Sequence, residues 1–195
     1  MSKKNIFFTT PFFLAAFLLF LPLFVSAADT YKVDPAHSAI VFRIKHLGIS
    51  YVYGRFHNPS GAVRFDEKAT ENGFVEISAK VQDIDTGNTQ RDDHLKSPDF
   101  FHAEKFPLIL FKSKGIKKRE GRLYDVMGDM SLHGVTRPMS IVVEFTGSGK
   151  DPWGGYRVGA ETTFNIKRSD YGMTTMLGPV GDDVRITVSI EAVRE

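Results

Sequence analysis

The sequence predicts an all-β fold: an antiparallel sheet of about eight strands that closes into a barrel with an open interior. Apolar and polar residues alternate in short runs, which indicates strands with one buried and one solvated face. Gly, Pro, Asn and Asp separate these runs, as they do in turns. Several apolar-face positions are small, namely Ala79, Gly128, Ala160 and Thr162. Small inward residues leave room in a barrel but also mark tight bends, so a cavity barrel is favoured over a packed sandwich.

Eight runs carry the alternation, and each predicts one strand. The clearest run comes last, where Val184, Ile186 and Val188 alternate with Arg185 and Thr187. Successive side chains of a strand point to opposite faces, so such a run has one apolar and one polar face. The predicted strands span 40–45, 53–65, 75–81, 108–113, 123–132, 139–145, 157–167 and 184–192.

One short helix is predicted over 88–96, near the mouth of the barrel. Asn88 or Thr89 can cap its first turn, and Pro98 follows its end. Asp92 and Asp93 lie in the first turn, where acidic side chains suit the helix dipole.

The first 27 residues predict a cleavable signal peptide. Lys3 and Lys4 precede an uncharged run over 5–28 that ends in the small residues Ser26 and Ala27. An uncleaved membrane anchor is the alternative, because the run is almost long enough to span a bilayer. Cleavage leaves one β-barrel domain over 28–195, exported to the periplasm without an integral membrane anchor.

Charge and cysteine content exclude several classes of function. The chain has 25 Lys and Arg and 23 Asp and Glu, and two of the lysines lie in the leader, so the mature chain is formally neutral. Bulk charge therefore offers no attraction to nucleic acid or to an anionic membrane. The chain has no cysteine, which excludes thiol chemistry, iron–sulfur clusters and cysteine-ligated zinc.

A series of motifs resembles the YceI-like family, whose members are polyisoprenoid- or lipid-binding domains. In chain order the motifs are Val33–Ser38, Phe42–Gly48, Thr86–Asn88, Arg91–Phe101, Phe106–Pro107, Gly128–Pro138 and Lys167–Met173. They cover most of the mature chain. Two small departures are Tyr171, where the family usually has Phe, and Met130, where Leu is common.

The resemblance implies an extended lipocalin-like barrel, largely periplasmic in bacteria, that encloses one long isoprenoid-type or fatty chain. It is also compatible with a homodimer. The implied function is to carry or store such a lipid, for example a polyprenyl quinone or a polyprenyl diphosphate. Two alternatives stay open: a hydrolase or isomerase that acts on such lipids through His94, Asp92 and Arg168, and a packed structural or interaction barrel without a ligand.

Apolar side chains on the inward faces are the candidates for the wall of the ligand tunnel. They are Phe42, Ile44, Val81, Phe111, Met130, Val143, Phe164, Ile166, Val184 and Ile186. His46 is in phase with Phe42 and Ile44, so it is expected to line the interior near one end.

Three cationic or titratable side chains are candidates for binding the head group. Arg91 and His94 share one face of the predicted helix, and Arg168 is in phase with the inward residues of its strand. Alternatively, the two arginines form structural salt bridges with Asp92, Asp99 or Asp170.

No cofactor or metal site is expected beyond the bound lipid. The histidines do not stand at a zinc-site spacing. No serine lies in a nucleophile-elbow sequence, so the sequence predicts a binding protein and not an enzyme.

Overall fold

The computed structural model describes residues 29–66 and 69–195. The signal peptide predicted over 1–27 lies outside the described residues. The strands are β1 (Thr30–Val33), β2 (Ala39–His46), β3 (Ser50–Phe56), β4 (Ser60–Arg64), β5 (Phe74–Lys80), β6 (Ile84–Asp85), β7 (Leu108–Lys118), β8 (Leu123–Leu132), β9 (Val135–Lys150), β10 (Tyr156–Lys167) and β11 (Val180–Arg194). The helices are α1 (Thr89–Lys96) and the 3₁₀ turns η1 (Pro35–His37), η2 (Thr70–Asn72), η3 (Val81–Asp83) and η4 (Arg168–Tyr171).

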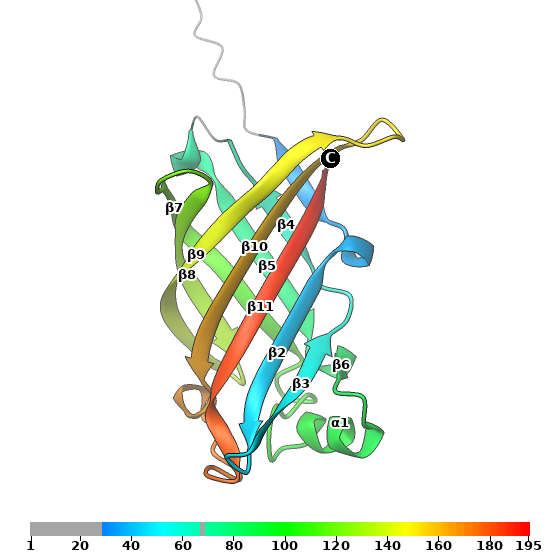
Figure 1. The fold of residues 1–195 in the computed structure, drawn as a ribbon, viewed down its shortest axis with the longest axis vertical. Coiled ribbons are helices and arrows are strands. Elements are labelled where there is room, and N and C mark those ends of the chain that lie inside the picture. Colours follow the sequence, from blue (N-terminus) through cyan, green and yellow to red (C-terminus); the bar gives the residue numbers. More distant parts are fainter. Residues whose placement is uncertain (1–28, 67–68) are drawn as a thin grey trace, which may run out of the picture.

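Eight strands close into an antiparallel barrel, as predicted. The hydrogen-bonded order is β1-β4-β5-β7-β8-β9-β10-β11, and β11 pairs back to β1. One edge of β11 serves two partners in turn: its last residues pair with β1, and its earlier residues pair with β2. The strands β2, β3 and β6 therefore extend the sheet past β11, and α1 lies beside them at the lower end of the barrel (Figure 1).

Several strands differ from the sequence prediction: β1 and β6 were not predicted, and β7, β9 and β11 extend beyond the predicted runs. The strand β1 alternates polar and apolar residues over Thr30–Val33, but four residues are too few for the alternation to stand out in the sequence. The predicted run over 53–65 is two strands, since the chain turns at Asn58, which has a φ of 51°, and at the buried Pro59. Val81 was assigned to a strand, but it begins a 3₁₀ turn.

The helix α1 begins as predicted and is fixed to the strand before it. The side chain of Asn88 caps it by accepting a hydrogen bond from the Arg91 amide at 2.9 Å. Asp92 is buried and accepts hydrogen bonds from the Thr86 amide at 2.9 Å and the Thr86 hydroxyl at 2.5 Å. These contacts hold α1 against the end of β6.

A short loop bridges the point where β11 changes partner. The Asp34 amide donates to the Glu191 carbonyl at 2.9 Å, and the Ser38 hydroxyl donates to the same carbonyl at 3.2 Å. The Ser38 hydroxyl also accepts from the Glu191 amide at 3.0 Å. Buried backbone groups need hydrogen-bond partners. Asp34 and Ser38 supply the partners that a neighbouring strand would otherwise give the backbone of Glu191.

Within residues 29–66 and 69–195, we find no helix whose length and apolar character would let it cross a bilayer.

Candidate functional site

The barrel encloses an apolar cavity of about 450 Å³. Its wall includes Phe42, Phe111, Phe164 and Ile166, which point inward yet are only partly buried because they face the void. Larger side chains such as Tyr124 and Leu132, each 3% exposed, are buried around the cavity, so the void lies inside a packed shell. The cavity has the volume and apolar lining typical of a ligand site.

Aromatic side chains gather at two places on the cavity wall. Toward the end opposite α1, the Phe65 ring lies 5.1 Å from Tyr124 and 5.2 Å from Phe145, between ring centroids. Beside α1, Phe56 lies 5.6 Å from Phe42 and 5.7 Å from Phe101. The rings supply much of the apolar area that a ligand would contact.

The solvent-exposed part of the lining at the α1 end marks a mouth. His46, Arg91, His94 and Met176 all line the cavity and are exposed. They come from the end of β2, from α1 and from the loop before β11. A ligand that enters here passes two imidazoles and one guanidinium before it reaches the apolar interior.

Thirteen of the fourteen site residues selected from the sequence line this cavity. They are Phe42, Ile44, His46, Arg91, His94, Phe111, Met130, Val143, Phe164, Ile166, Arg168, Val184 and Ile186. Their contact with a ligand stays a prediction. The exception is Val81, which does not line the cavity, because the chain leaves the strand at this residue and the Val81 amide donates to the Pro107 carbonyl at 2.9 Å.

Not all of the small residues predicted to face inward leave room for the cavity. Ala79, Ala160 and Thr162 line it. Gly128 does not create space: a Cβ there would lie 2.4 Å from the Lys112 carbonyl oxygen and 2.8 Å from the Phe111 ring. This glycine permits close approach of β7 and its aromatic side chain.

Arg168 is a structural residue of the mouth. Its side chain is 3% exposed, and it donates to four backbone carbonyls, those of Gly181 (2.8 Å), Met173 (2.9 Å), Thr175 (2.7 Å) and Val180 (3.1 Å). Burial lowers the pKa of the guanidinium, and the charge of Asp182 opposes that shift. The salt bridge considered with Asp170 is wrong, because Asp170 lies 3.8 Å from Arg137 instead.

Arg91 and His94 lie at the mouth, but Arg91 pairs with none of the acids considered for it, and the acid beside His94 is Asp99 instead of Asp92. Arg91 donates from Nε to the Thr86 hydroxyl and from Nη2 to the Thr86 carbonyl, both at 2.7 Å. His94 Nε2 lies 3.0 Å from Asp99 Oδ2, and its ring meets Phe100 edge-on at 5.0 Å. Because Asp92 accepts from Thr86 and not from His94, the base considered for a hydrolase is not assembled.

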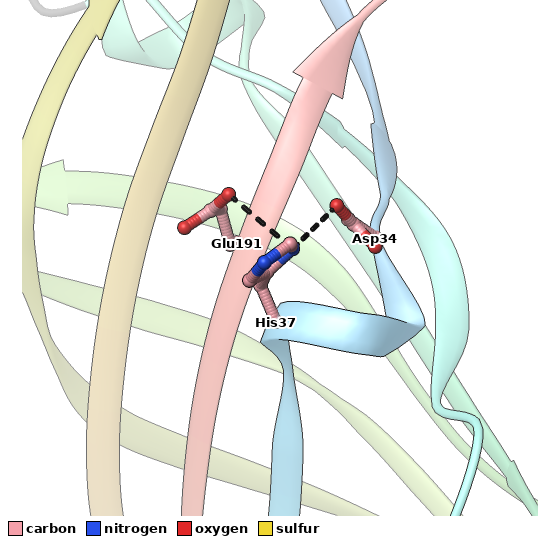
Figure 2. Close-up of side chains that lie close together, drawn as sticks. All are labelled: Asp34, His37 and Glu191. Carbon is pink, nitrogen blue, oxygen red and sulfur yellow. Dashed lines mark hydrogen bonds and ion pairs between the residues drawn. The ribbon is translucent and has the colours of Figure 1, made fainter. Parts of the chain in front are cut away.

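A second cluster on the barrel has donors suited to a metal ion: Asp34, His37 and Glu191 (Figure 2). His37 Nδ1 lies 2.8 Å from Asp34 Oδ2 and 3.9 Å from Glu191 Oε1. However, Arg157 Nη1 donates to Asp34 at 2.8 Å and also to Glu191. The guanidinium therefore already neutralises the two carboxylates that would otherwise bind a metal ion.

Arg157 ties this cluster to a neighbouring hairpin. Its Nε donates to Asp151 at 2.8 Å. The hydrogen bond from Arg157, followed by that from His37, lowers the pKa of Asp34 to about 2. Sequence reasoning missed this cluster, because Arg157 and Glu191 lie far along the chain from Asp34 and His37 and no local pattern joins them. The cluster stabilises the change of strand partner at Glu191.

Comparison with known proteins places the chain in a family. The family model described as the YceI-like domain matches residues 31–192. The UPF0312 protein plu2095 of Photorhabdus laumondii is 42% identical over 184 residues, 93% of this chain and 95% of the relative. Two solved structures share the fold. BcnA of Burkholderia cenocepacia has a TM-score of 0.75 at 24% identity, covering 82% of this chain and 99% of that one.

The second structure is from Saccharophagus degradans. It is described as a polyisoprenoid binding domain implicated in plant cell wall breakdown. It matches with a TM-score of 0.68 at 15% identity, covering 87% of this chain and all of that domain, 100%. The family match, the closed barrel and the full-length relative agree, and the chain belongs to the YceI-like domain family.

Proposed function

We propose that the protein binds one long apolar lipid of the polyisoprenoid type in the barrel cavity, and that it carries or stores this lipid in the periplasm. The observation that carries the proposal is the apolar cavity of about 450 Å³. The polyisoprenoid binding described for the Saccharophagus degradans domain supports the same ligand class. The predicted signal peptide supports export.

The energetics of such a ligand suit this cavity. Burying hydrocarbon yields about 0.8 kcal/mol per methylene, so each five-carbon unit contributes roughly 3–4 kcal/mol before the cost of ordering the tail. Affinity then comes from tail length and needs few polar contacts. Binding without catalysis is also supported by the separate hydrogen-bond partners of His94, Asp92 and Arg168.

The mouth favours a weakly charged head group. A diphosphate calls for at least two accessible cations, but four donors of Arg168 are committed to backbone carbonyls. Arg91 and His94 are then the polar groups that a head group would meet. A polyprenyl quinone fits this pair better than a polyprenyl diphosphate.

Solvent extraction of the purified mature protein, followed by mass spectrometry, tests the proposal. We expect about one isoprenoid chain per protein. An Ala160→Phe variant fills the cavity from β10 and should yield none. Asn165→Phe adds the same ring to the exposed face of β10 and should retain the lipid. If the wild-type protein holds no lipid and takes up no apolar probe, the proposal fails.

A further inference from the structure

Two loops at the α1 end expose large apolar side chains to solvent. Leu47 and Ile49, in the turn between β2 and β3, are 57% and 84% exposed, and Met176 and Leu177, in the loop before β11, are 50% and 42% exposed. The loops are joined, since the Leu47 amide donates to the Pro179 carbonyl at 2.7 Å. We call these four residues the apolar tip.

The backbone holds two residues of the apolar tip in an unfavourable conformation. Leu47 and Met176 have φ angles of 51° and 55°. The other non-glycine residues with positive φ in the described chain are Asn58, His102 and His133, all of them polar. The left-handed conformation is unfavourable for L-residues and is visited routinely only by Gly, with Asn and Asp next.

Leu47 also departs from the residue that its turn prefers. Leu47 and Gly48 are the central pair of the turn that the Ile49 amide closes by donating to the His46 carbonyl at 3.0 Å, and both have positive φ. Asn-Gly is the favoured pair in such a turn. Because folding does not call for leucine here, the exposed apolar side chain indicates a role outside the fold.

The apolar tip is bordered by cations stacked on a tyrosine. The guanidinium of Arg43 lies 4.3 Å from the centroid of the Tyr51 ring, and Lys45 Nζ lies 5.1 Å from it. Tyr51 and Tyr53 are both exposed. Amphipathic rings and long cationic side chains next to apolar groups suit the boundary between lipid head groups and acyl chains. Of the nearby acids, Asp182 accepts hydrogen bonds from Ser169, and Asp183 lies opposite Lys167 in the strand register.

The apolar tip adjoins the cavity mouth. Met176 belongs to both, and His46, which precedes Leu47, lines the cavity and pairs with Val180. A standard protein interface buries about 800 Å² per partner. Four side chains on two loop ends offer less than that, whereas protruding apolar loops need only insert into a fluid surface.

We propose that the apolar tip docks on a lipid bilayer, with Leu47, Ile49, Met176 and Leu177 inserted at the acyl boundary and Arg43 and Lys45 on anionic head groups. This inference rests on the proposed function, because docking places the mouth where a lipid tail can pass between the bilayer and the cavity. Attraction here comes from the apolar tip and its local cations, and the neutral net charge of the mature chain does not oppose it.

Flotation of the mature protein with phosphatidylethanolamine–phosphatidylglycerol vesicles tests the docking. The test variant is Ile49→Ser with Leu177→Ser, since neither residue lines the cavity. The control is Met127→Ser with Val142→Ser, which removes two exposed apolar side chains from β8 and β9. We expect wild type and control to float with the vesicles and the test variant to partition at least tenfold more weakly.

Uptake of the fluorescent fatty acid cis-parinaric acid separates this inference from the proposed function. All three proteins should bind the probe equally. If wild type binds the probe but not the vesicles, docking is wrong and the cavity function stands. If wild type binds no probe, the cavity function fails. If the test variant still floats, or instead changes only from dimer to monomer in sedimentation, the apolar tip is not a membrane surface.

Discussion

The middle of the barrel and its α1 end use the same alternating strands but differ in packing. At the α1 end, Leu132, Tyr171 and Met173 are buried in one cluster, and Arg168 donates to four backbone carbonyls. In the middle, Phe111 and Phe164 point inward and remain partly exposed to the cavity. Alternation therefore determines which side chains face inward, and side-chain size with local hydrogen bonding determines whether the interior is filled.

The largest expected effect is the loss of Arg168, which tests whether the α1 end depends on it. Arg168→Ala leaves four carbonyls without their charged donor, and hydrogen bonds to charged groups contribute about 1.5–3 kcal/mol each. We expect the free energy of unfolding to fall by more than about 3 kcal/mol in urea titrations at pH 7. Arg185→Ala, on the exposed face of β11, should change it by less than about 0.5 kcal/mol. Equal effects would contradict the structural role of Arg168.

Truncation of apolar side chains compares the two regions directly. Leu132→Ala should cost about 3 kcal/mol, because Leu132 is only 3% exposed and is packed in a buried cluster, although it also borders the cavity. Phe164→Ala removes more atoms, yet we expect it to cost less than about 2 kcal/mol, since the ring already borders a cavity. Urea unfolding of both variants gives the two values. A larger cost for Phe164→Ala would indicate that the middle is packed.

Substitution of small residues by phenylalanine tests the same difference between the packed α1 end and the open middle of the barrel. Ala79 is buried among Phe56 and Ile84, so Ala79→Phe should destabilise the protein by about 1–3 kcal/mol. Ala160→Phe should leave the melting temperature unchanged or raised, because the ring enters open space. Calorimetry of both variants measures this, and strong destabilisation by Ala160→Phe would show that no such space exists.

The smallest effect concerns the charged cluster outside the barrel. The pKa of Asp34 is lowered to about 2 from 3.8, so its ionised form stabilises the fold above about pH 4, and this contribution is lost as the pH falls toward 2. Asp34→Asn should lower the Tm by about 2–4 °C at pH 7 and by progressively less between pH 4 and pH 2. Melts followed by circular dichroism test this. A Tm difference that stays constant across that range would rule out the ion pair as its cause.

The barrel could be predicted from the sequence because the alternation of apolar and polar residues is a local signal that is present in every long strand. Most of the side chains selected from the sequence for the cavity wall do line the cavity for the same reason, since phase along a strand fixes which face a side chain occupies. The assignment of Val81 to a strand was wrong, because the apolar–polar alternation of the sequence continues one residue past the end of β5. A 3₁₀ turn after a strand leaves no apolar–polar signature to detect.

Partners distant in the chain could not be predicted. Arg168 was correctly placed inside, but its acceptors are backbone carbonyls, which any sequence supplies. Arg157 meets Asp34 across 123 positions of sequence separation. Leu47 at positive φ was also unforeseen, because its turn pairs an unfavoured residue with glycine. These contacts depend on the closed barrel as a whole.

The most direct test of the open apolar interior is the dependence of affinity on ligand length. Farnesol, geranylgeraniol and longer polyprenols would be titrated by displacement of cis-parinaric acid from wild type and from Ala160→Phe. We predict that wild-type affinity rises severalfold with each five-carbon unit until the cavity is filled, and that Ala160→Phe removes this rise. An affinity independent of tail length, or a rise unchanged by Ala160→Phe, would contradict the account.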